Sequence, residues 1–192
     1  MLLATTCPAC GRPGASPCAR CITLMRPANQ PPVPDSLDDC RALLDYAGVA
    51  REVVARVKYR NHRASVAWLA AGMARLFVTA EADVVAWAPT TASRRRRRGF
   101  DQAEVLARGV ATAHGLPCRP LLVRASGGAQ TGLGAEDRRH GPSFSPTRRI
   151  DGLNVALVDD VVTTGATLDA AAAALRSAGA GSVLGLAAAF TR

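Results

Sequence analysis

The stretch Val155-Ala156-Leu157-Val158-Asp159-Asp160-Val161-Val162-Thr163-Thr164-Gly165-Ala166-Thr167-Leu168 decides how the chain is expected to fold. Its apolar beginning, Val155 to Val158, predicts a strand that is buried on both faces of a parallel sheet. The alanine- and leucine-rich run that starts at Leu168 favours a helix. The order is therefore strand, acidic pair, Thr/Gly loop and helix. In open α/β sheets, ligands bind at the carboxyl ends of such strands.

The chemistry of this stretch suits a phosphorylated sugar. A Thr/Gly turn that leads into a helix N-terminus offers backbone N–H groups and the positive end of the helix dipole to a phosphate. The carboxylates of Asp159 and Asp160 suit ribose hydroxyls or a hydrated Mg2+ beside that phosphate. A buried strand followed by an acidic helix cap is the plain structural alternative. The stretch has no Gly-Lys-Ser/Thr ending, which excludes a P-loop.

The same stretch resembles the motif of type I phosphoribosyltransferases that binds phosphoribosyl pyrophosphate (PRPP). That motif consists of apolar residues, two acids and a loop rich in Thr, Ser and Gly. The resemblance implies the following PRPP-binding residues: Asp159, Asp160, Thr163, Thr164, Gly165, Ala166 and Thr167.

The composition indicates one domain with room for a small appendage. The chain has 192 residues, of which 48% are hydrophobic, and its net charge is +9. This charge predicts attraction to polyanions, either phosphorylated substrates or nucleic acid. No apolar run reaches the roughly 20 residues of a membrane helix. The first residues also lack the basic region of a signal peptide. We therefore expect a cytoplasmic protein without membrane insertion.

Four of the six cysteines form two CxxC pairs near the N-terminus, Cys7 with Cys10 and Cys18 with Cys21. Each pair can place two thiolates on one metal ion, and four thiolates with no open position describe a structural Zn2+ site. The short segment has no other core, so the metal would supply its folding energy. A redox role is the weaker alternative, because no thioredoxin-like βαβ pattern surrounds the pairs.

A proline-rich segment, residues 29–34, predicts a stiff linker between the cysteine module and the rest of the chain. We accordingly expect a zinc-binding module with its linker at residues 1–34 and a main domain at residues 35–192. Within the main domain, an amphipathic helix should end in the basic tip Lys58-Tyr59. This tip either faces an anionic ligand or is a solvated helix end.

A second strand–loop–helix unit follows at residues 83–113. A strand ending at Pro89 leads into a hydroxylated and strongly basic loop up to Arg98, and a helix starts at residue 102. Such a loop suits pyrophosphate, because arginine forks pair with phosphate oxygens. A targeting signal, a nucleic-acid patch or a solvated charge run are the alternatives. The candidate pyrophosphate residues are Pro89, Thr90, Arg96 and Arg98.

The run Arg96-Arg97-Arg98-Gly99-Phe100-Asp101-Gln102 resembles the Arg-x-Arg-Gly-Phe-Asn-Gln signature of the ComF family. These are bacterial phosphoribosyltransferase-like proteins that are associated by name with DNA uptake in natural competence. Asp101 replaces the usual Asn. The cysteine module, the Lys58-Tyr59 tip and the PRPP motif occur in the family's order, so the resemblance covers nearly the whole chain.

The polar and Gly-rich segment 126–141 is long enough to be a lid or binding loop. Type I phosphoribosyltransferases have a closing loop at this place, and Gln130, Leu133 and Arg138 match the ComF pattern. Arg138 is therefore a candidate catalytic residue together with the acidic pair. Gly141 replaces the family's usual Asn. His140 is either an acid/base group or an exposed loop histidine.

The resemblance implies a type I phosphoribosyltransferase fold, a parallel sheet flanked by helices, with a zinc-ribbon-like appendage. It also implies transfer of ribose 5-phosphate from PRPP, bound with Mg2+, to an unknown acceptor. Residues 36–63 and the cysteine module are candidates for the acceptor side. The alternative hypothesis is a non-catalytic competence factor that binds single-stranded DNA through Arg94 to Arg98. Other competence proteins are further candidate partners.

Overall fold

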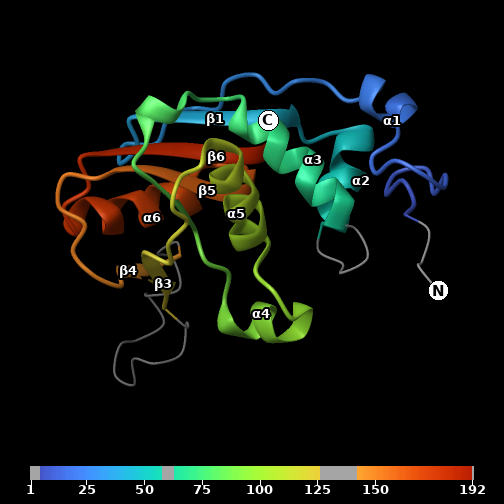
Figure 1. Cartoon of the computed structure of the whole chain (residues 1–192). Helices are drawn as coiled ribbons and strands as arrows, with labels where there is room; N and C mark the ends of the chain where they lie inside the picture. The colour runs from blue at the N-terminus through green and yellow to red at the C-terminus, as the bar shows by residue number, and fades with distance from the viewer. Residues whose placement is uncertain (1–4, 58–62, 126–141, 192) are drawn as a thin grey trace.

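A four-stranded parallel sheet forms the centre of the protein (Figure 1). The computed structural model describes residues 5–57, 63–125 and 142–191. The strand order is β1-β6-β5-β2, and all neighbouring pairs run parallel. The bounds are β1 Asp39–Asp45, β2 Val84–Trp87, β5 Asn154–Val162 and β6 Ser182–Phe190. The prediction of an α/β fold around a parallel sheet is confirmed.

Strand β5 lies between β6 and β2, as its apolar sequence predicts. Val158 lies opposite Trp87 on one side and Leu186 on the other. A strand with neighbours on both edges and helices on both faces has no side in water, which is why it tolerates an unbroken apolar run. The prediction that this strand ends at Val158 was wrong. It continues through the acidic pair to Val162, because the end of β6 pairs with it there.

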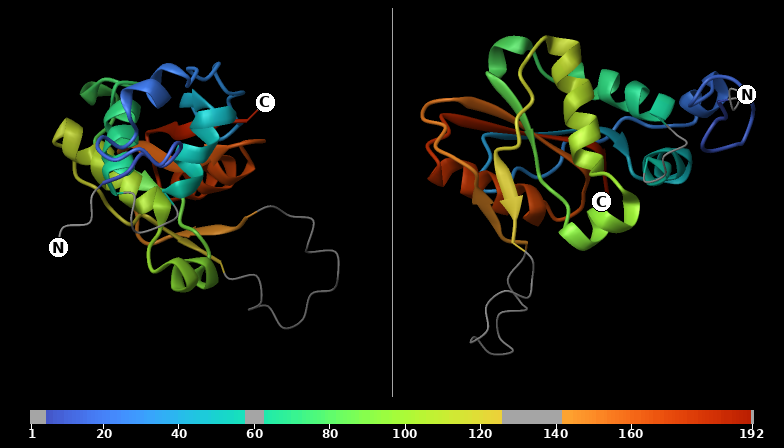
Figure 2. Two further views of the ribbon diagram at one scale, coloured as in Figure 1. Left: turned by 90° about the vertical axis from the view of Figure 1, so that its right-hand side faces the viewer. Right: turned by 60° about the horizontal axis from the view of Figure 1, so that its bottom comes forward.

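Helices cover both faces of the sheet (Figures 1 and 2). Three helices share one buried cluster on one face: α2 Gly48–Arg56, α3 Arg63–Ala74 and α5 Gln102–His114. Helix α6 Ala166–Ser177 packs on the other face. Beside α6 lies a small antiparallel sheet of β3 Leu122–Arg124 and β4 Phe144–Pro146. Short helical turns lie at α1 Ala19–Thr23 and Thr79–Glu81.

The side chains on the two faces of β5 and β6 belong to two separate hydrophobic cores. Ala156 and Val158 pack with α2, α3 and α5, whereas Val155 and Leu157 pack with α6. This alternation follows from the two-residue period of a strand. Alanine supplies much of the helix surface in α6, where small side chains let the helix approach the sheet closely. The low aromatic content of the chain is compatible with this packing.

The arginine run forms helix α4, Ala92–Arg98, where the sequence predicted a loop. Thr91 caps the helix, since its side chain accepts a hydrogen bond from the Arg94 N–H group at 3.3 Å. Arginine also has a high helix propensity. Gly99 ends the helix in a left-handed conformation with φ of 78°. Helix α4 projects away from the sheet (Figures 1 and 2).

The N-terminal segment lies against the main domain at several places. Ser16 and Ser65 form a buried hydroxyl–hydroxyl hydrogen bond of 2.7 Å, which joins the cysteine module to α3. The chain then runs antiparallel to β1, where the Ala28 N–H group donates to the Leu43 carbonyl. Further along, Pro34 packs against the Cα atom of Gly165.

None of the described helices is long and apolar enough to cross a membrane.

Candidate functional site

A polar cavity of about 190 Å³ lies at the carboxyl ends of β2 and β5. This is the edge of an α/β sheet at which ligands are expected. The cavity is lined by residues from β5, the loop after β2, α4, the start of α5, β3 and the first turn of α6. The residues that line it are Ala88, Thr90, Arg94, Arg98, Asp101, Gln102, Ala103, Arg124, Asp159, Asp160, Val161 and Thr167.

The acidic pair lines this cavity. Asp159 and Asp160 are both half-buried. The Asp160 N–H group donates to Oδ1 of Asp159 at 2.8 Å, and the Val161 N–H group donates to Oδ1 of Asp160 at 2.9 Å. Burial raises the pKa of Asp159 well above its usual range, and the nearby charge of Asp160 adds to this rise. The pair is thus well placed to accept hydrogen bonds from a ligand's hydroxyl groups.

The predicted PRPP loop forms a second, smaller hollow of about 30 Å³ beside the cavity. Thr163, Thr164, Gly165, Ala166 and Thr167 all line it. The loop ends at the N-terminus of α6, whose first N–H groups and dipole favour an anion. The two hollows share three lining residues, namely Asp159, Val161 and Thr167.

Gly165 fixes the shape of this loop. Its φ of 80° belongs to the left-handed region that side chains rarely adopt. A Cβ atom at this position would also lie 2.7 Å from Cγ of Pro34. Two residues further along, the Ser36 N–H group donates to Oδ1 of Asp169 in the first turn of α6, at 2.9 Å. Pro34 and Ser36, which follow the cysteine module, therefore contact the loop and the first turn of α6.

The predicted pyrophosphate residues divide into two groups. Thr90 and Arg98 line the cavity, and Arg94 joins them. Pro89 and Arg96 are absent from the described residues that line it. Helical spacing explains the division, because Arg94 and Arg98 are four residues apart on one face of α4. Arg96 is exposed to solvent.

Asp101 connects the loop after β2 to helix α5, a role that the sequence analysis did not assign. Its carboxylate is 3% exposed. Oδ2 accepts from the Thr90 N–H group at 2.7 Å, and Oδ1 accepts from the Ala103 N–H group at 3.1 Å. Burial raises the pKa of Asp101, although these N–H groups oppose the rise. The position of Asp101 in the Arg-Gly-Phe-Asp-Gln run was the sequence feature that could have indicated this role.

Arg124 is a second residue that the sequence analysis missed. It comes from β3, and its guanidinium group lies 5.3 Å from the centre of the Phe144 ring on β4. Burial lowers the pKa of Arg124, and the charge of Arg94 lowers it further, while Asp159 and Asp101 oppose this. The guanidinium groups of Arg94, Arg98 and Arg124 thus line the same cavity. No sequence signal linked a residue on this short strand to the PRPP motif.

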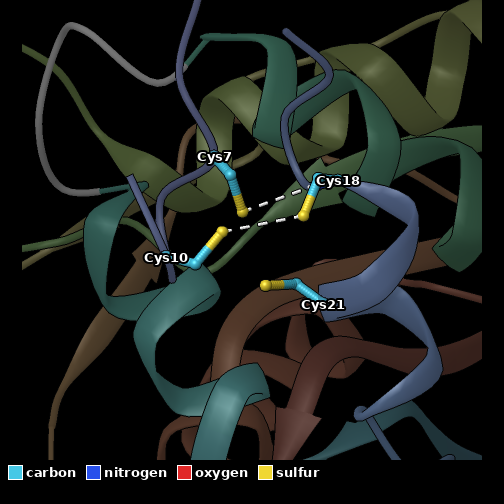
Figure 3. Close-up of side chains that lie close together, drawn as sticks. All are labelled: Cys7, Cys10, Cys18 and Cys21. Carbon is cyan, nitrogen blue, oxygen red and sulfur yellow. Dashed lines mark hydrogen bonds between the residues drawn. The ribbon is translucent and has the colours of Figure 1, made fainter. Parts of the chain in front are cut away.

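The four predicted metal ligands converge at the N-terminus. The side chains of Cys7, Cys10, Cys18 and Cys21 point toward one another (Figure 3). Their Sγ atoms all lie within 4.8 Å of one another, and those of Cys10 and Cys18 are 3.7 Å apart. A tetrahedral Zn2+ site with Zn–S distances of about 2.3 Å requires S···S distances of about 3.8 Å. The cluster therefore fits a four-thiolate metal site.

The thiols of this cluster strongly affect one another. Burial and the neighbouring thiols raise the pKa of Cys21 to about 12. Burial also raises the pKa of Cys7, but backbone N–H groups, with that of Cys18 first, outweigh it and lower the pKa to about 6. The geometry favours one thiolate and opposes a second, so four thiolates require a cation at their centre.

Several predicted features lie outside the described residues. They are the basic tip Lys58-Tyr59, the candidate lid 126–141, and within it Gln130, Leu133, Arg138 and His140. Of the two cysteines outside the cluster, Cys40 is buried and Cys118 is half-buried.

The parallel sheet, the loop at the N-terminus of α6 and the acidic pair at the end of β5 define a type I phosphoribosyltransferase fold. Among solved structures, the chain is similar to one described as the allosteric regulatory enzyme of purine biosynthesis. The TM-score is 0.50 at 23% identity. The match covers 69% of this chain but only 30% of that longer chain, and it bears on the fold alone.

The family described as "Phosphoribosyl transferase domain" matches residues 73–192. Competence protein ComFC of Bacillus subtilis is 28% identical over 182 residues, which are 90% of this chain and 72% of that protein. DNA utilization protein YhgH of Salmonella typhimurium is 30% identical over 194 residues, which are 92% of this chain and 80% of that protein. The chain belongs to the phosphoribosyltransferase domain family and, within it, to the ComF family.

Proposed function

We propose that the protein binds PRPP with Mg2+ and transfers its ribose 5-phosphate to an acceptor that is not yet identified. One observation carries this proposal, namely the pair of hollows that share Asp159, Val161 and Thr167. The smaller hollow, at the start of α6, suits a single phosphate. The larger one holds three arginines and suits a diphosphate. The acidic pair lies where a ribose would connect the two.

Each part of the site has a role in this reaction. The loop Thr163–Thr167 would hold the 5-phosphate, and Asp159 and Asp160 would accept hydrogen bonds from the ribose hydroxyls. Arg94, Arg98 and Arg124 would hold the pyrophosphate. During transfer the bond from the ribose C1 atom to pyrophosphate breaks and a bond from C1 to the acceptor forms. Positive charge on the ribose and negative charge on the leaving group make electrostatic stabilisation the main contribution.

Mg2+ fits this site through the carboxylate oxygens of the acidic pair and the phosphate oxygens of the ligand. When bound, it would neutralise charge on the leaving pyrophosphate. Closure of residues 126–141, with Arg138 as a catalytic residue, remains part of the proposal. So does an acceptor side formed by residues 36–63 and the cysteine module (residues 1–34 with the linker). We further propose Zn2+ as the ion of the four cysteines and the reducing cytoplasm as the compartment.

Calorimetric titration of the protein with PRPP tests this function. We expect one site per chain that depends on Mg2+, and pyrophosphate release when the correct acceptor is supplied from a panel of bases. No heat of binding with PRPP in the presence of Mg2+ would refute the proposal.

A second candidate function, binding of single-stranded DNA, is favoured by the outer face of α4. Arg96 and Arg97 are exposed, and neither makes an ion pair with any described residue. The neighbouring Arg95 lies 3.8 Å from Glu104. An uncompensated basic face of this kind attracts phosphate backbones in a salt-dependent way. The names of the competence and DNA-utilization relatives agree with this candidate.

We expect the double substitution Arg96→Ala/Arg97→Ala to weaken binding of a single-stranded oligonucleotide several-fold and to reduce its salt dependence. Each lost phosphate contact lowers the slope of log K against log salt by about 0.7. Fluorescence anisotropy at several salt concentrations measures both quantities. PRPP binding should stay at the wild-type level, because these side chains lie outside the cavity. An unchanged oligonucleotide affinity would exclude this face as the DNA site.

A further inference from the structure

The side-chain amide of Gln102, the first residue of α5, has a hydrogen-bond partner for its oxygen but none among the described residues for its nitrogen. Gln102 lines the cavity and is 4% exposed. Oε1 accepts from a guanidinium N–H group of Arg98 at 2.6 Å. Nε2 is buried and has no hydrogen-bond partner among the described residues. A buried donor without an acceptor is rare in native proteins, because it loses its hydrogen bonds to water without replacement.

The orientation of this amide follows from its partner. A guanidinium group only donates hydrogen bonds, so the atom that faces Arg98 must be the carbonyl oxygen. Reversing the amide would place two donors against each other. The N–H2 group of Gln102 therefore has to find its acceptor elsewhere.

The surroundings indicate which acceptor this is. Arg94, Arg98 and Arg124 make this side of the cavity cationic. The carboxylate oxygens of Asp101 are already engaged by the N–H groups of Thr90 and Ala103. Asp159 and Asp160 also line the cavity, but neither is a hydrogen-bond partner of Nε2. A negatively charged group that is rich in acceptors suits both the free N–H2 group and the three guanidinium groups. A diphosphate is such a group, and the cavity of about 190 Å³ has room for it.

We propose that Gln102 belongs to the pyrophosphate subsite in two ways. Its Oε1 atom fixes the guanidinium group of Arg98 at the cavity, and its Nε2 group donates directly to a non-bridging oxygen of the diphosphate. This inference rests on the proposed PRPP-binding function and names a ligand donor that lies outside both the PRPP loop and the arginine run.

A double-mutant cycle separates direct donation from an effect through Arg98. The variants are Gln102→Met, Arg98→Met and the combination, each titrated with pyrophosphate and Mg2+. A hydrogen bond to a charged group is worth about tenfold in affinity or more, so we expect Gln102→Met to weaken binding about tenfold. Part of this loss, at least about threefold, should persist in the Arg98→Met background. If Gln102→Met has no effect in that background, direct donation is refuted.

Gln102→Glu provides a second variant for the case in which the methionine variant folds poorly. Glutamate keeps an oxygen for Arg98 but has no N–H group, so it should weaken pyrophosphate binding at least as much as Gln102→Met. Wild-type affinity in Gln102→Glu would overturn the proposal.

Ribose 5-phosphate is the control ligand, because it should use the PRPP loop and the acidic pair without the diphosphate subsite. Its affinity should stay within about twofold in the Gln102 variants. An equal loss of affinity for pyrophosphate and for ribose 5-phosphate would show a general structural effect and would refute the inference. If the wild type binds neither ribose 5-phosphate nor PRPP, the proposed function itself fails. If it binds both and the Gln102 variants match it, only this inference fails.

Discussion

Replacing Asp159 and Asp160 together by asparagine is expected to weaken PRPP binding by about 100-fold or more. Each carboxylate would accept a charge-assisted hydrogen bond from the ribose, and such bonds contribute about 1.5–3 kcal/mol each. Asparagine preserves the shape of both side chains, so the loss would report charge and hydrogen bonding. Calorimetric titration with PRPP and Mg2+ measures the effect.

The same substitution should leave the fold intact or stabilise it. Burial raises the pKa of Asp159 in the folded protein, so the folded state holds this proton more tightly than the unfolded state. Stability from this group is therefore greatest at low pH and is lost as the pH rises through the raised pKa. At neutral pH, Asp159→Asn removes the unfavourable free energy of burying a charged carboxylate. We expect its Tm to equal or exceed that of the wild type.

PRPP affinity should fall on acidification at a pH above the usual aspartate range, because protonated Asp159 cannot accept as a carboxylate does. Asp151→Asn is the matched control. Asp151 precedes the opposite end of β5 and pairs with the exposed Arg149, so its loss should not change PRPP affinity. A double variant with wild-type affinity would contradict the role of the acidic pair.

Removing the proposed Zn2+ from the four-cysteine cluster should have the largest effect on stability. Structural Zn2+ sites in small peptides contribute apparent free energies of about 10–16 kcal/mol. Within residues 5–25, the buried apolar cluster consists of Cys7, Cys18 and Cys21 themselves, so this segment has little other core that could replace the metal. We expect one Zn2+ per chain by metal analysis, and unfolding of this segment on chelation.

Cys7→Ser should lower the bound Zn2+ to well below one per chain and expose the segment to proteases. Cys118→Ser is the control, because Cys118 is half-buried and lies apart from the cluster. Because Ser16 and Ser65 connect the module to α3, hydrogen exchange should also increase around Ser65. A metal-free protein with a protected N-terminal segment would rule out the zinc assignment.

The parts of the site that come from one continuous stretch were predictable from the sequence. The strand, the acids and the loop of Val155–Leu168 carry their own geometry, since each element directly follows the last. The cysteine pairs are likewise local. In both cases the spacing along the chain sets the distances in space.

The parts that come from distant elements were not predictable in this way. Arg124 reaches the cavity from β3, whose pairing with β4 spans many residues. The prediction named Arg96 and not Arg94, and it placed the arginine run in a loop, whereas the run forms helix α4. A loop has no periodicity, whereas a helix places residues four apart on one side. Gln102 belongs to the signature run, but its role became visible only with its bond to Arg98 and with a side-chain N–H2 group that has no partner among the described residues.

The contact between Pro34 and Gly165 has a consequence for the thermodynamics of ligand binding. A loop that is free in solution must lose conformational entropy when a phosphate orders it, and this loss weakens affinity. Here the proline-rich segment before β1 lies against the loop in the folded chain. The entropy would therefore be lost during folding, and a phosphate that binds as proposed would meet a loop that is already preorganised. The length and stiffness of a segment that touches no ligand would thus help to set the affinity for PRPP.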